Sequence, residues 1–364
     1  MVAELPRLVL LGGGHAQLAV LLALARRRPV QVEAVLVTPA ARQIYSGMLP
    51  GWLAGHYTEA QCVIPLAPLA AAAGVTLRQA AAVGLDAAAR TVRLDDGGVL
   101  GYDVLSVNTG PVQDPAGWGA AGVPTLRPIE DWLVRTTRRL AEAPPGRVVV
   151  VGGGAAGFEL ALAWRHRLGA DAEVGLVTGA SGLLANYPAA VRRLGVQALA
   201  ERGVRCIAGA ARTVALNAVV TDDGRVWAAD EIVLATGTVA PHWLQGSGLA
   251  LAPDGGLAIR PTLQSVSHPE VFAAGDVATR LDRPLPKSGV YAVRAGAALA
   301  ENVLGRLAGR VPRPWVAPVR TLNLLSLGER SAIAAWGPLA VQGRWVWRWK
   351  DGIDRGFLQR HGAT

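Results

Sequence analysis

Two glycine-rich segments hold the residues whose types and spacing point most directly to chemistry. "RVVVVGGGAAGFELALAWRHR", at 147–167, contains Gly152, Gly154 and Gly157 in a G-x-G-x-x-G pattern. In such a turn the first glycine permits a tight bend, the second lets the backbone approach a pyrophosphate, and the third lets helix and strand pack closely. The first amides of the following helix then face the anion. This segment therefore predicts a dinucleotide-binding turn.

A similar segment, "LVLLGGGHAQLAV", stands at 8–20 and departs from the pattern at one position. Gly12 and Gly14 are present, but Gln17 occupies the place of the third glycine. Both turns follow an apolar strand-like run and precede a helical one, and each is followed by a second strand pattern, at 32–38 and 172–178. This repeated β-α-β plan favours two nucleotide-binding domains over two unrelated glycine turns.

The expected second strands end in threonine rather than in the usual acidic residue. Thr38 and Thr178 stand where an Asp or Glu commonly binds ribose hydroxyls. A threonine hydroxyl can form the same kind of hydrogen bond more weakly, and no arginine follows Thr178 directly to bind a 2′-phosphate. The sequence therefore leaves NADH and NADPH open.

Composition supports a cytoplasmic α/β enzyme. The 364 residues are 51% hydrophobic, include 44 glycines and carry a net charge of +9, with Lys287 and Lys350 as the only lysines. That charge suits anionic partners such as nucleotides or a lipid surface, and we expect no nucleic-acid partner. The apolar stretch near the N-terminus is broken at 12–15, and no apolar run approaches the roughly 18 residues of a spanning helix. We expect attachment to a membrane surface at most.

Three further motifs give the chain a family resemblance. "DVLSVNTG" at 103–110 and "DEIVLATGTVAP" at 230–241 look like paired crossovers between two domains, and "PEVFAAGDVA" at 269–278 looks like a second FAD motif. With the two glycine turns, the chain resembles the two-domain flavoproteins of the pyridine nucleotide-disulfide oxidoreductase superfamily. The resemblance implies FAD at the first turn and NAD(P)H at the second.

The same resemblance implies an α/β fold with two Rossmann-like dinucleotide-binding domains. We expect a discontinuous FAD domain at 1–112 and 242–315, an inserted NAD(P)H domain at 113–241, and a short C-terminal region at 316–364.

Within the superfamily, "LPKSGVYAVRAGAALAEN" at 285–302 looks like a stretch of type II NADH dehydrogenases. "YSGMLPGWLAGHY" at 45–57 and "GRWVWRWKDGIDRGF" at 343–357 resemble a subgroup that in some bacteria is fused to selenide, water dikinase. This subgroup tolerates a bulkier third residue in the first turn. We therefore interpret Gln17 as a variation that holds the helix slightly farther from the strand.

The resemblance also implies the binding residues. Asp276 is expected to accept hydrogen bonds from the ribityl chain of FAD, His15 to contact its phosphates, and a helix beginning near Gly289 or Val290 to point its amides at the flavin. The full FAD set comprises Gly12, Gly14, His15, Ala16, Thr38, Arg42, Thr109, Gly110, Gly275, Asp276, Ser288, Gly289 and Val290. The NAD(P)H set comprises Gly152, Gly154, Ala155, Ala156, Gly157, Thr178, Thr236 and Gly237.

By the dehydrogenase resemblance, Glu159 and Lys287 are the catalytic candidates. We expect them to meet near the isoalloxazine and to set the proton supply to the acceptor. The alternatives are a helix-surface carboxylate for Glu159 and a solvated loop charge for Lys287.

The cysteine count decides how electrons pass. Classical members use a redox disulfide, but the corresponding region at 45–62 holds Cys62 alone, which excludes that relay and disfavours a sulfide–quinone oxidoreductase. We interpret Cys62 as a small buried hydrophobe and Cys206 as a buried strand residue, and neither has metal-ligand spacing.

The sequence therefore predicts an FAD-dependent NAD(P)H dehydrogenase that passes electrons by direct hydride transfer to a quinone or similar small acceptor. The alternative is a low-turnover flavoprotein acting as a redox sensor or partner-binding protein.

The tail, residues 343–364, is rich in tryptophan and arginine. Trp345, Trp347 and Trp349 alternate like a strand, whereas Val346, Trp349, Ile353 and Phe357 are spaced like one helix face. A basic amphipathic segment of this kind can lie in a membrane interface. The alternative is that it packs on the protein or forms a homodimer contact.

Overall fold

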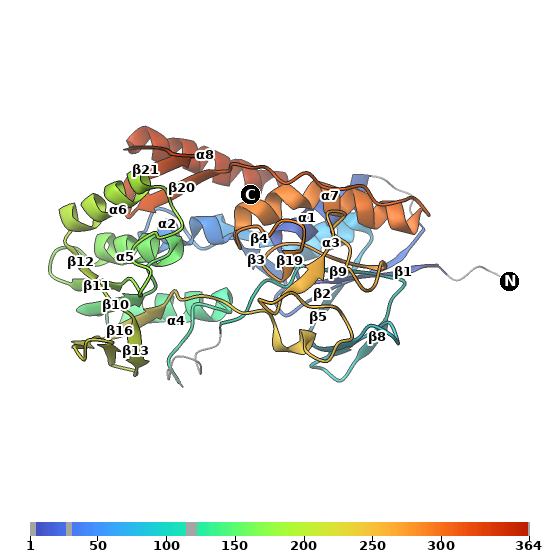
Figure 1. The fold of residues 1–364 in the computed structure, drawn as a ribbon, viewed down its shortest axis with the longest axis horizontal. Coiled ribbons are helices and arrows are strands. Elements are labelled where there is room, and N and C mark those ends of the chain that lie inside the picture. The colour runs from blue at the N-terminus through green and yellow to red at the C-terminus, as the bar shows by residue number, and fades with distance from the viewer. Residues whose placement is uncertain (1–4, 27–30, 114–121, 363–364) are drawn as a thin grey trace.

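The protein has two lobes, each built around a parallel β-sheet, and a C-terminal helix that extends along both (Figure 1). We describe it from a computed structural model, which describes residues 5–26, 31–113 and 122–362. The α/β fold with two Rossmann-like sheets is as predicted. The exact domain boundaries remain a prediction.

The first lobe contains a five-stranded parallel sheet in the order β18-β9-β1-β2-β5. Its strands are β1 (Arg7–Leu11), β2 (Glu33–Thr38), β5 (Thr76–Gln79), β9 (Val104–Val107) and β18 (Val271–Ala273). β18 comes more than 160 residues after β9 in the chain, yet it pairs directly with β9. Segments on both sides of the second lobe therefore build one sheet.

The second lobe contains a four-stranded parallel sheet in the order β12-β11-β10-β16. Its strands are β10 (Arg147–Val151), β11 (Glu173–Val177), β12 (Val204–Ile207) and β16 (Glu231–Leu234). The four valines after Arg147 are all buried, as a parallel strand covered on both faces requires.

Two crossovers connect the lobes and pair with each other. Val112 donates its backbone N–H to the carbonyl of Val239 at 2.9 Å, and Val239 donates to the carbonyl of Val112 at the same distance. The crossover motifs at 103–110 and 230–241 thus lead into a two-stranded connection between the lobes.

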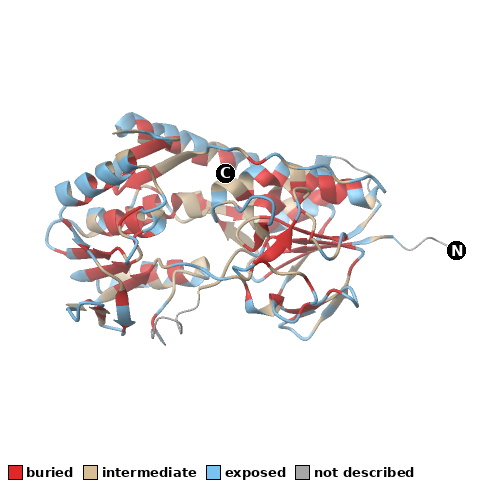
Figure 2. Cartoon of the chain, in the orientation of Figure 1, coloured by how far each residue is buried: buried red, intermediate tan, exposed pale blue. Residues whose placement is uncertain are grey.

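The helices cover the sheets and close the molecule. They are α1 (His15–Arg26), α2 (Leu49–Leu53), α3 (Leu66–Ala73), α4 (Ile129–Glu142), α5 (Ala155–Leu168), α6 (Ala189–Glu201), α7 (Gly289–Leu307) and α8 (Arg344–Arg360). α1 packs against α7 on the first sheet, and α5 packs against β10 and β11 in the second lobe. Buried side chains concentrate in the two sheets and on the helix faces toward them (Figure 2).

Smaller sheets complete the fold. Antiparallel sheets join β6 (Ala82–Asp86), β7 (Thr91–Leu94) and β8 (Val99–Gly101); β13 (Ala211–Val214), β14 (Ala218–Thr221) and β15 (Val226–Ala228); β20 (Leu322–Leu327), β21 (Glu329–Trp336) and β22 (Leu339–Gly343); and β3 (Arg42–Ile44) and β4 (Val63–Pro65). β17 (Leu257–Ile259) and β19 (Ala278–Arg280) form a parallel pair.

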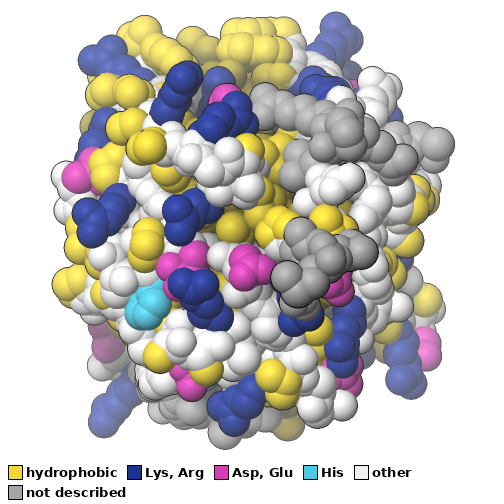
Figure 3. All heavy atoms as spheres, turned by 90° about the vertical axis from the view of Figure 1, so that its right-hand side faces the viewer, with side chains coloured by type: hydrophobic (Ala, Val, Ile, Leu, Met, Phe, Trp, Pro, Cys, Tyr) yellow, Lys and Arg dark blue, Asp and Glu magenta, His cyan; other side chains and the backbone are white. Residues whose placement is uncertain are grey.

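On the end of the molecule shown in Figure 3, basic side chains are scattered rather than gathered into one patch.

Candidate functional site

The second glycine turn is tightly packed on two sides and open on the third. A Cβ on Gly157 would lie 1.9 Å from the carbonyl oxygen of Gly152, and one on Gly152 would lie 2.3 Å from the oxygen of Ala235. A Cβ on Gly154 would meet no atom of the described residues within 4 Å. A dinucleotide turn requires this arrangement: the first and third glycines pack against backbone, and the second leaves space for the ligand.

Helices α5 and α7 begin without a side-chain cap. The residues before them, Gly154 and Ser288, make no capping hydrogen bond from a side chain among the described residues. Uncapped N-terminal amides carry partial positive charge and suit phosphate or another anion. The helix expected near Gly289 begins at that residue, as predicted.

The first glycine turn uses Gln17 for a specific purpose. The Gln17 side chain is fully buried; its Nε2 donates to the carbonyl of Ser106 on β9 at 3.3 Å, and its Oε1 accepts from Ser106 Oγ at 2.9 Å. The first helix therefore leaves room for an amide side chain where α5 leaves room for no side chain. This pair of hydrogen bonds supplies a reason for the departure at Gln17.

Asn108, which the sequence reasoning missed, organises the first turn. Its Oδ1 accepts from the amides of Ala16 and Gln17 at 3.0 and 3.2 Å, and its Nδ2 donates to the carbonyl of Ala274 at 2.5 Å. Asn108 thus ties the start of α1 to the strand before Asp276. The Ala16 amide, expected to face FAD, has a protein partner here. The signal for Asn108 was a polar residue directly after a fully buried strand.

Asp276 and Arg127 carry charges that the fold leaves without hydrogen bonds. Burial raises the pKa of the half-buried Asp276 carboxyl, and among the described residues its side chain has no hydrogen-bond or ion-pair partner. Burial lowers the pKa of Arg127, whose guanidinium makes no such contact within the described residues either. Arg127 lies near Gly110 and influences His15 electrostatically. Both groups fit the polar parts of a dinucleotide, and Arg127 had not been identified from the sequence.

His15 lies where the first turn meets the C-terminal helix. Burial, with help from the Arg127 and His361 charges, lowers the pKa of its imidazole to about 4, so the ring is neutral at pH 7. Its Nδ1 lies 3.3 Å from Gln43 Nε2, and the ring packs edge-on against Tyr45. A neutral imidazole can contact phosphate only by hydrogen bonding, which is a weaker role than that of a cation.

Arg42 is held by two carboxylates. Its Nε and one terminal nitrogen donate to both oxygens of Glu130 at 3.0 and 2.9 Å, and the other terminal nitrogen pairs with Glu59 at 2.5 Å. This arrangement joins β3 to α4. Contact between Arg42 and FAD stays a prediction, and the structure shows a bridging role as well.

The other predicted binding residues lie at strand ends and crossovers. Thr38 and Thr178 are buried at the ends of β2 and β11, and the Thr178 hydroxyl donates to the carbonyl of Ile207 at 3.3 Å. Thr109 and Gly110 follow β9, and Thr236 and Gly237 follow β16. Gly275 directly precedes Asp276, and Val290 is the second residue of α7. Binding by these residues and by Gly12, Gly14, Ala155 and Ala156 stays a prediction.

The expected pairing of Glu159 with Lys287 is wrong. Lys287 Nζ donates to the carbonyl of Ala278 at 2.7 Å and to Thr279 Oγ1 at 2.6 Å, and it pairs with Asp254 at 3.3 Å. These partners hold its ammonium at β19. The motif match placed Lys287 before α7 correctly but could not show the direction of its side chain.

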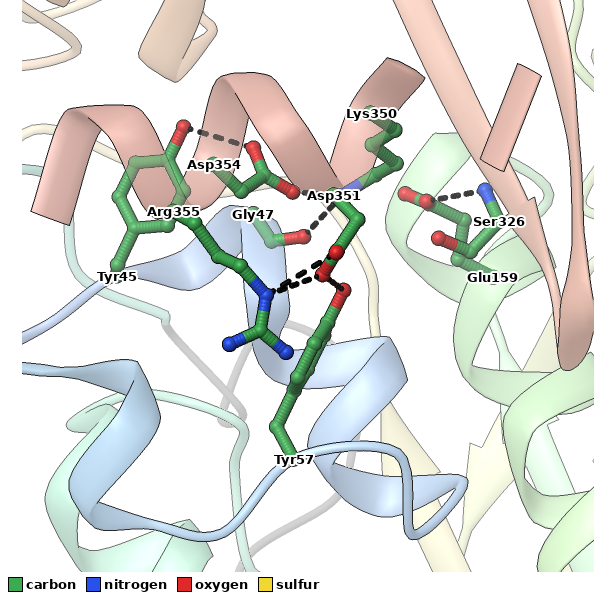
Figure 4. A network of polar contacts seen from close by, with 9 residues as sticks. All are labelled: Tyr45, Gly47, Tyr57, Glu159, Ser326, Lys350, Asp351, Asp354 and Arg355. Carbon is green, nitrogen blue, oxygen red and sulfur yellow. Dashed lines mark hydrogen bonds and ion pairs between the residues drawn. The ribbon is translucent and has the colours of Figure 1, made fainter. Parts of the chain in front are cut away.

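Glu159 faces the C-terminal helix instead. It is half-buried on the first turns of α5, its Oε1 accepts from the backbone N–H of Ser326 at 2.7 Å, and burial raises the pKa of its carboxyl to about 7 (Figure 4). The Lys350 charge acts in the opposite direction and lowers that pKa. A carboxyl of this kind can hold or release a proton near neutral pH.

The two cysteines are free thiols. Cys62 is fully buried, and burial raises the pKa of its thiol to about 12, which fits the predicted apolar role. Cys206 is exposed on β12, so its predicted burial is wrong. β12 is the edge strand of its sheet, and only Val204 and Ile207 face the core there.

From Arg344 on the tail is the helix α8, so the strand-like alternation expected for Trp345, Trp347 and Trp349 is wrong. The buried face of this helix also differs from the expected one. Val346, Lys350, Asp354 and Phe357 face the protein, while Trp345, Trp349 and Ile353 are exposed. The sequence reasoning placed Trp349 and Ile353 on the face of Val346 and Phe357. No buried role was expected for Lys350 and Asp354.

Comparison with known proteins agrees with this architecture. Residues 6–296 match the pyridine nucleotide-disulphide oxidoreductase family, and the chain belongs to it. It is thus an FAD-dependent NAD(P)H oxidoreductase, as predicted. No helix within the described residues is long and apolar enough to cross a membrane.

Two curated relatives extend the comparison. The chain is 26% identical over 353 residues to a demethylphylloquinone reductase of Synechocystis, with 91% of this chain and 85% of the relative covered. It is 32% identical over 252 residues to the ferredoxin reductase component of a chlorobenzene dioxygenase from Cupriavidus, with 64% of this chain and 58% of the relative covered. The match thus spans less than two thirds of the Cupriavidus protein.

Solved structures show the same fold. NDH2 of Plasmodium falciparum, in complex with NADH, superposes with a TM-score of 0.82 at 11% identity and covers 98% of this chain and 97% of its own. The sulfide:quinone oxidoreductase of Aquifex aeolicus superposes with a TM-score of 0.78 at 18% identity, covering 98% of this chain and 91% of its own.

Proposed function

We propose that this protein is an NAD(P)H dehydrogenase whose acceptor is a quinone or a similar small molecule, reached without a redox disulfide. The carrying observation is the half-buried Glu159 on the first turns of the nucleotide-binding helix, with Lys350 of the tail facing it. Bound FAD would supply the two-electron chemistry between nicotinamide and acceptor. The residues of this chain supply binding, exclusion of water and a proton.

Two further observations support this proposal. The free thiols Cys62 and Cys206 lie on different lobes, which favours direct transfer over a disulfide relay. The Synechocystis relative, which aligns with most of the chain, is named as a quinone reductase. We also propose that the tail subgroup resemblance, to flavoproteins fused to selenide, water dikinase, reflects a common acceptor site built by segments 45–57 and 343–357.

The proposed proton donor is Glu159. Reduction of a quinone to a hydroquinone consumes two electrons and two protons, and a hydride equivalent brings both electrons but only one proton. A carboxyl whose pKa is about 7 is half-protonated at neutral pH and can deliver the second proton. Above that pH the donor is lost, so quinone reduction should slow as Glu159 ionises.

We further propose that the exposed side of α8 lies on the inner face of the cell membrane, close to the quinone pool. Trp345, Trp349 and Ile353 are 56, 46 and 42% exposed, and the two indole rings stack with their centroids 6.5 Å apart. Arg348 and Arg360 line a shallow groove beside Trp349 and Ile353. Tryptophan with arginine suits the boundary between acyl chains and anionic headgroups.

Replacing Trp345, Trp349 and Ile353 by serine should reduce binding to anionic phospholipid vesicles by about tenfold or more, because each apolar side chain buried in the interface contributes to binding. Vesicle flotation measures the loss. The matched control replaces Val316 and Val319, which are 88 and 78% exposed outside the tail. Equal vesicle binding by the unaltered protein, the serine variant and the valine control would reject the tail as the anchor. A lower sedimentation coefficient in the serine variant alone would instead indicate a homodimer contact.

The acceptor is tested on the reduced enzyme. After anaerobic reduction with NADH, a water-soluble benzoquinone should restore the oxidised flavin absorbance within the turnover time. A plant-type ferredoxin, offered at equal concentration, should reoxidise the enzyme more slowly. Faster reoxidation by the ferredoxin would contradict the proposed acceptor class.

A further inference from the structure

Lys350 is a buried ammonium held between two parts of the chain. Its side chain is 9% exposed, and Nζ donates to Asp354 Oδ2 and to the carbonyl of Gly47, each at 2.6 Å. An ammonium has three donors, and these bonds use two of them. Figure 4 shows the Lys350 side chain between Asp354 and Glu159, and its charge acts on Glu159 as described above.

Both carboxylate oxygens of Asp354 have a hydrogen-bond partner in this arrangement. Its side chain is 7% exposed; Oδ2 accepts from Lys350, and Oδ1 accepts from the hydroxyl of Tyr45 at 3.2 Å. Because Asp354 follows Lys350 by four residues in α8, the helix itself holds the two groups on one face. Glu159, by contrast, is held by the backbone of Ser326 and keeps capacity for a proton.

One ammonium therefore acts on two carboxyl groups: it bonds directly to the buried Asp354 and acts on Glu159 through its charge. Both cannot ionise there without leaving a net negative charge, and burial disfavours such a charge. Burial raises the pKa of the Asp354 carboxyl, but its direct bonds to Lys350 and Tyr45 oppose that shift, so ionisation is assigned to Asp354 and the proton to Glu159. The negative charge on Asp354 also prevents Lys350 from holding Glu159 fully ionised.

We infer that Asp354 is a positioning residue for the proton donor: it fixes the Lys350 ammonium beside Glu159 and leaves Glu159 as the carboxyl that gains and releases the proton. This inference rests on the proposed reduction of a quinone-type acceptor. It assigns a function to the buried polar face of α8, and it makes the tail part of the acceptor site rather than only a cover.

The other charged or titratable groups around the two carboxyls come from several elements. Those that act on or respond to Glu159 are Lys350 and Asp354 on α8 and Tyr187 before α6. Lys350, Tyr45 and Asp351 act on Asp354, which in turn acts on Tyr57 and Cys62. Around these neighbours, Arg360 acts on Tyr45, and Arg355 and Glu59 act on Cys62. Lys350 is the cation bonded to Asp354, so its removal and the removal of Asp354 have opposite consequences for Glu159.

The chemical balance is that of a two-electron reduction. NAD(P)H, a quinone and one proton give NAD(P)+ and a hydroquinone. The hydride leaves the nicotinamide with both electrons, and the O–H bond of the Glu159 carboxyl breaks to give the second proton to a quinone oxygen. Solvent then returns a proton to the Glu159 carboxylate.

The test compares Asp354→Asn and Lys350→Gln in the FAD-loaded enzyme. The rate of benzoquinone reduction should fall at high pH as Glu159 ionises; this fall is the alkaline limb. With Asp354→Asn, the Lys350 charge is no longer balanced, so the limb should begin about one pH unit lower. With Lys350→Gln, the limb should move up by about the same amount. Glu142→Gln is the matched control; Glu142 accepts from Arg138 in another i,i+4 helical pair, exposed on α4, and its loss should leave the limb in place.

Infrared titration of the protonated carboxyl band, assigned with Glu159→Gln, measures the same shifts without turnover. Ferricyanide takes electrons without protons, so its reduction should lack the limb in every variant. Shifts in the same direction, or none, in Asp354→Asn and Lys350→Gln would overturn the inference. If the infrared shifts occur but Glu159→Gln leaves the quinone profile unchanged, the proposed donor role fails instead. Should Asp354→Asn not fold, the upward shift in Lys350→Gln is still required.

Discussion

Replacing Gly154 by valine should abolish reduction of the flavin by NADH while the protein keeps its FAD and its thermal stability. The reason is the open space beside Gly154, where an added Cβ meets no described atom within 4 Å. Valine would occupy the space through which the pyrophosphate approaches the backbone. We expect binding of NADH or NADPH to weaken by about 100-fold or more. Titration of the flavin absorbance with each nucleotide measures the loss.

Two comparisons make this prediction specific. Dithionite should still reduce the flavin of Gly154→Val, because that reductant needs no nucleotide site. Gly157→Ala should instead lower the melting temperature, since its Cβ would lie 1.9 Å from the Gly152 oxygen. Normal flavin reduction by NADH in Gly154→Val would show that the second turn does not bind the nucleotide.

Replacing Asp276 by leucine should yield a folded protein with little FAD. Within the described residues the Asp276 carboxylate has no hydrogen-bond partner, so the substitution breaks no such contact of the fold. Its loss would remove charge-assisted hydrogen bonds to the ribityl chain, which we expect to weaken FAD binding by about 10- to 100-fold. The ratio of flavin to protein absorbance after gel filtration measures occupancy.

Asp254→Asn is the matched control for this change. Asp254 accepts from Thr279 at 2.7 Å and pairs with Lys287, so it belongs to the surface of the same lobe and not to the predicted cofactor site. It should retain full FAD occupancy. Equal occupancy in Asp276→Leu and Asp254→Asn would remove Asp276 from the cofactor site.

The parts of the site that depend on local backbone geometry were predictable from the sequence. The turn at Gly152 and the helix start at Ala155 follow from glycine spacing and apolar runs, because a strand–turn–helix unit is specified within a few residues. The helix start at Gly289 followed from the family resemblance. Paired occurrence then predicted two lobes.

Contacts between distant segments were not predictable in the same way. Asn108 reaches Ala16 across 92 residues of chain, and Tyr45 reaches Asp354 across 309. The choice of Lys287 as the partner of Glu159 followed a motif, but only the fold shows that Lys350 is the lysine on that side. The same limit applies to the tail, where helical spacing predicted a face but not which face the protein covers.

Buried polar residues also misled the sequence reasoning in a consistent direction. Gln17 was interpreted as a tolerated variation and Asp354 was given no role, yet both are buried with specific partners, Ser106 and Lys350. Hydrophobic periodicity cannot identify such positions, because a buried polar group is stable only when a distant residue satisfies it. Of the two, Asp354 also belongs to the proposed acceptor site.

The central claim is that electrons enter this protein from a nicotinamide nucleotide through bound FAD. The most direct test is anaerobic stopped-flow mixing of the purified, FAD-loaded protein with NADH and, separately, with NADPH. We predict rapid bleaching of the oxidised flavin band with at least one nucleotide, followed by its return when benzoquinone is added. An oxidised flavin band that persists with both nucleotides would contradict the account and favour a redox sensor or partner-binding protein.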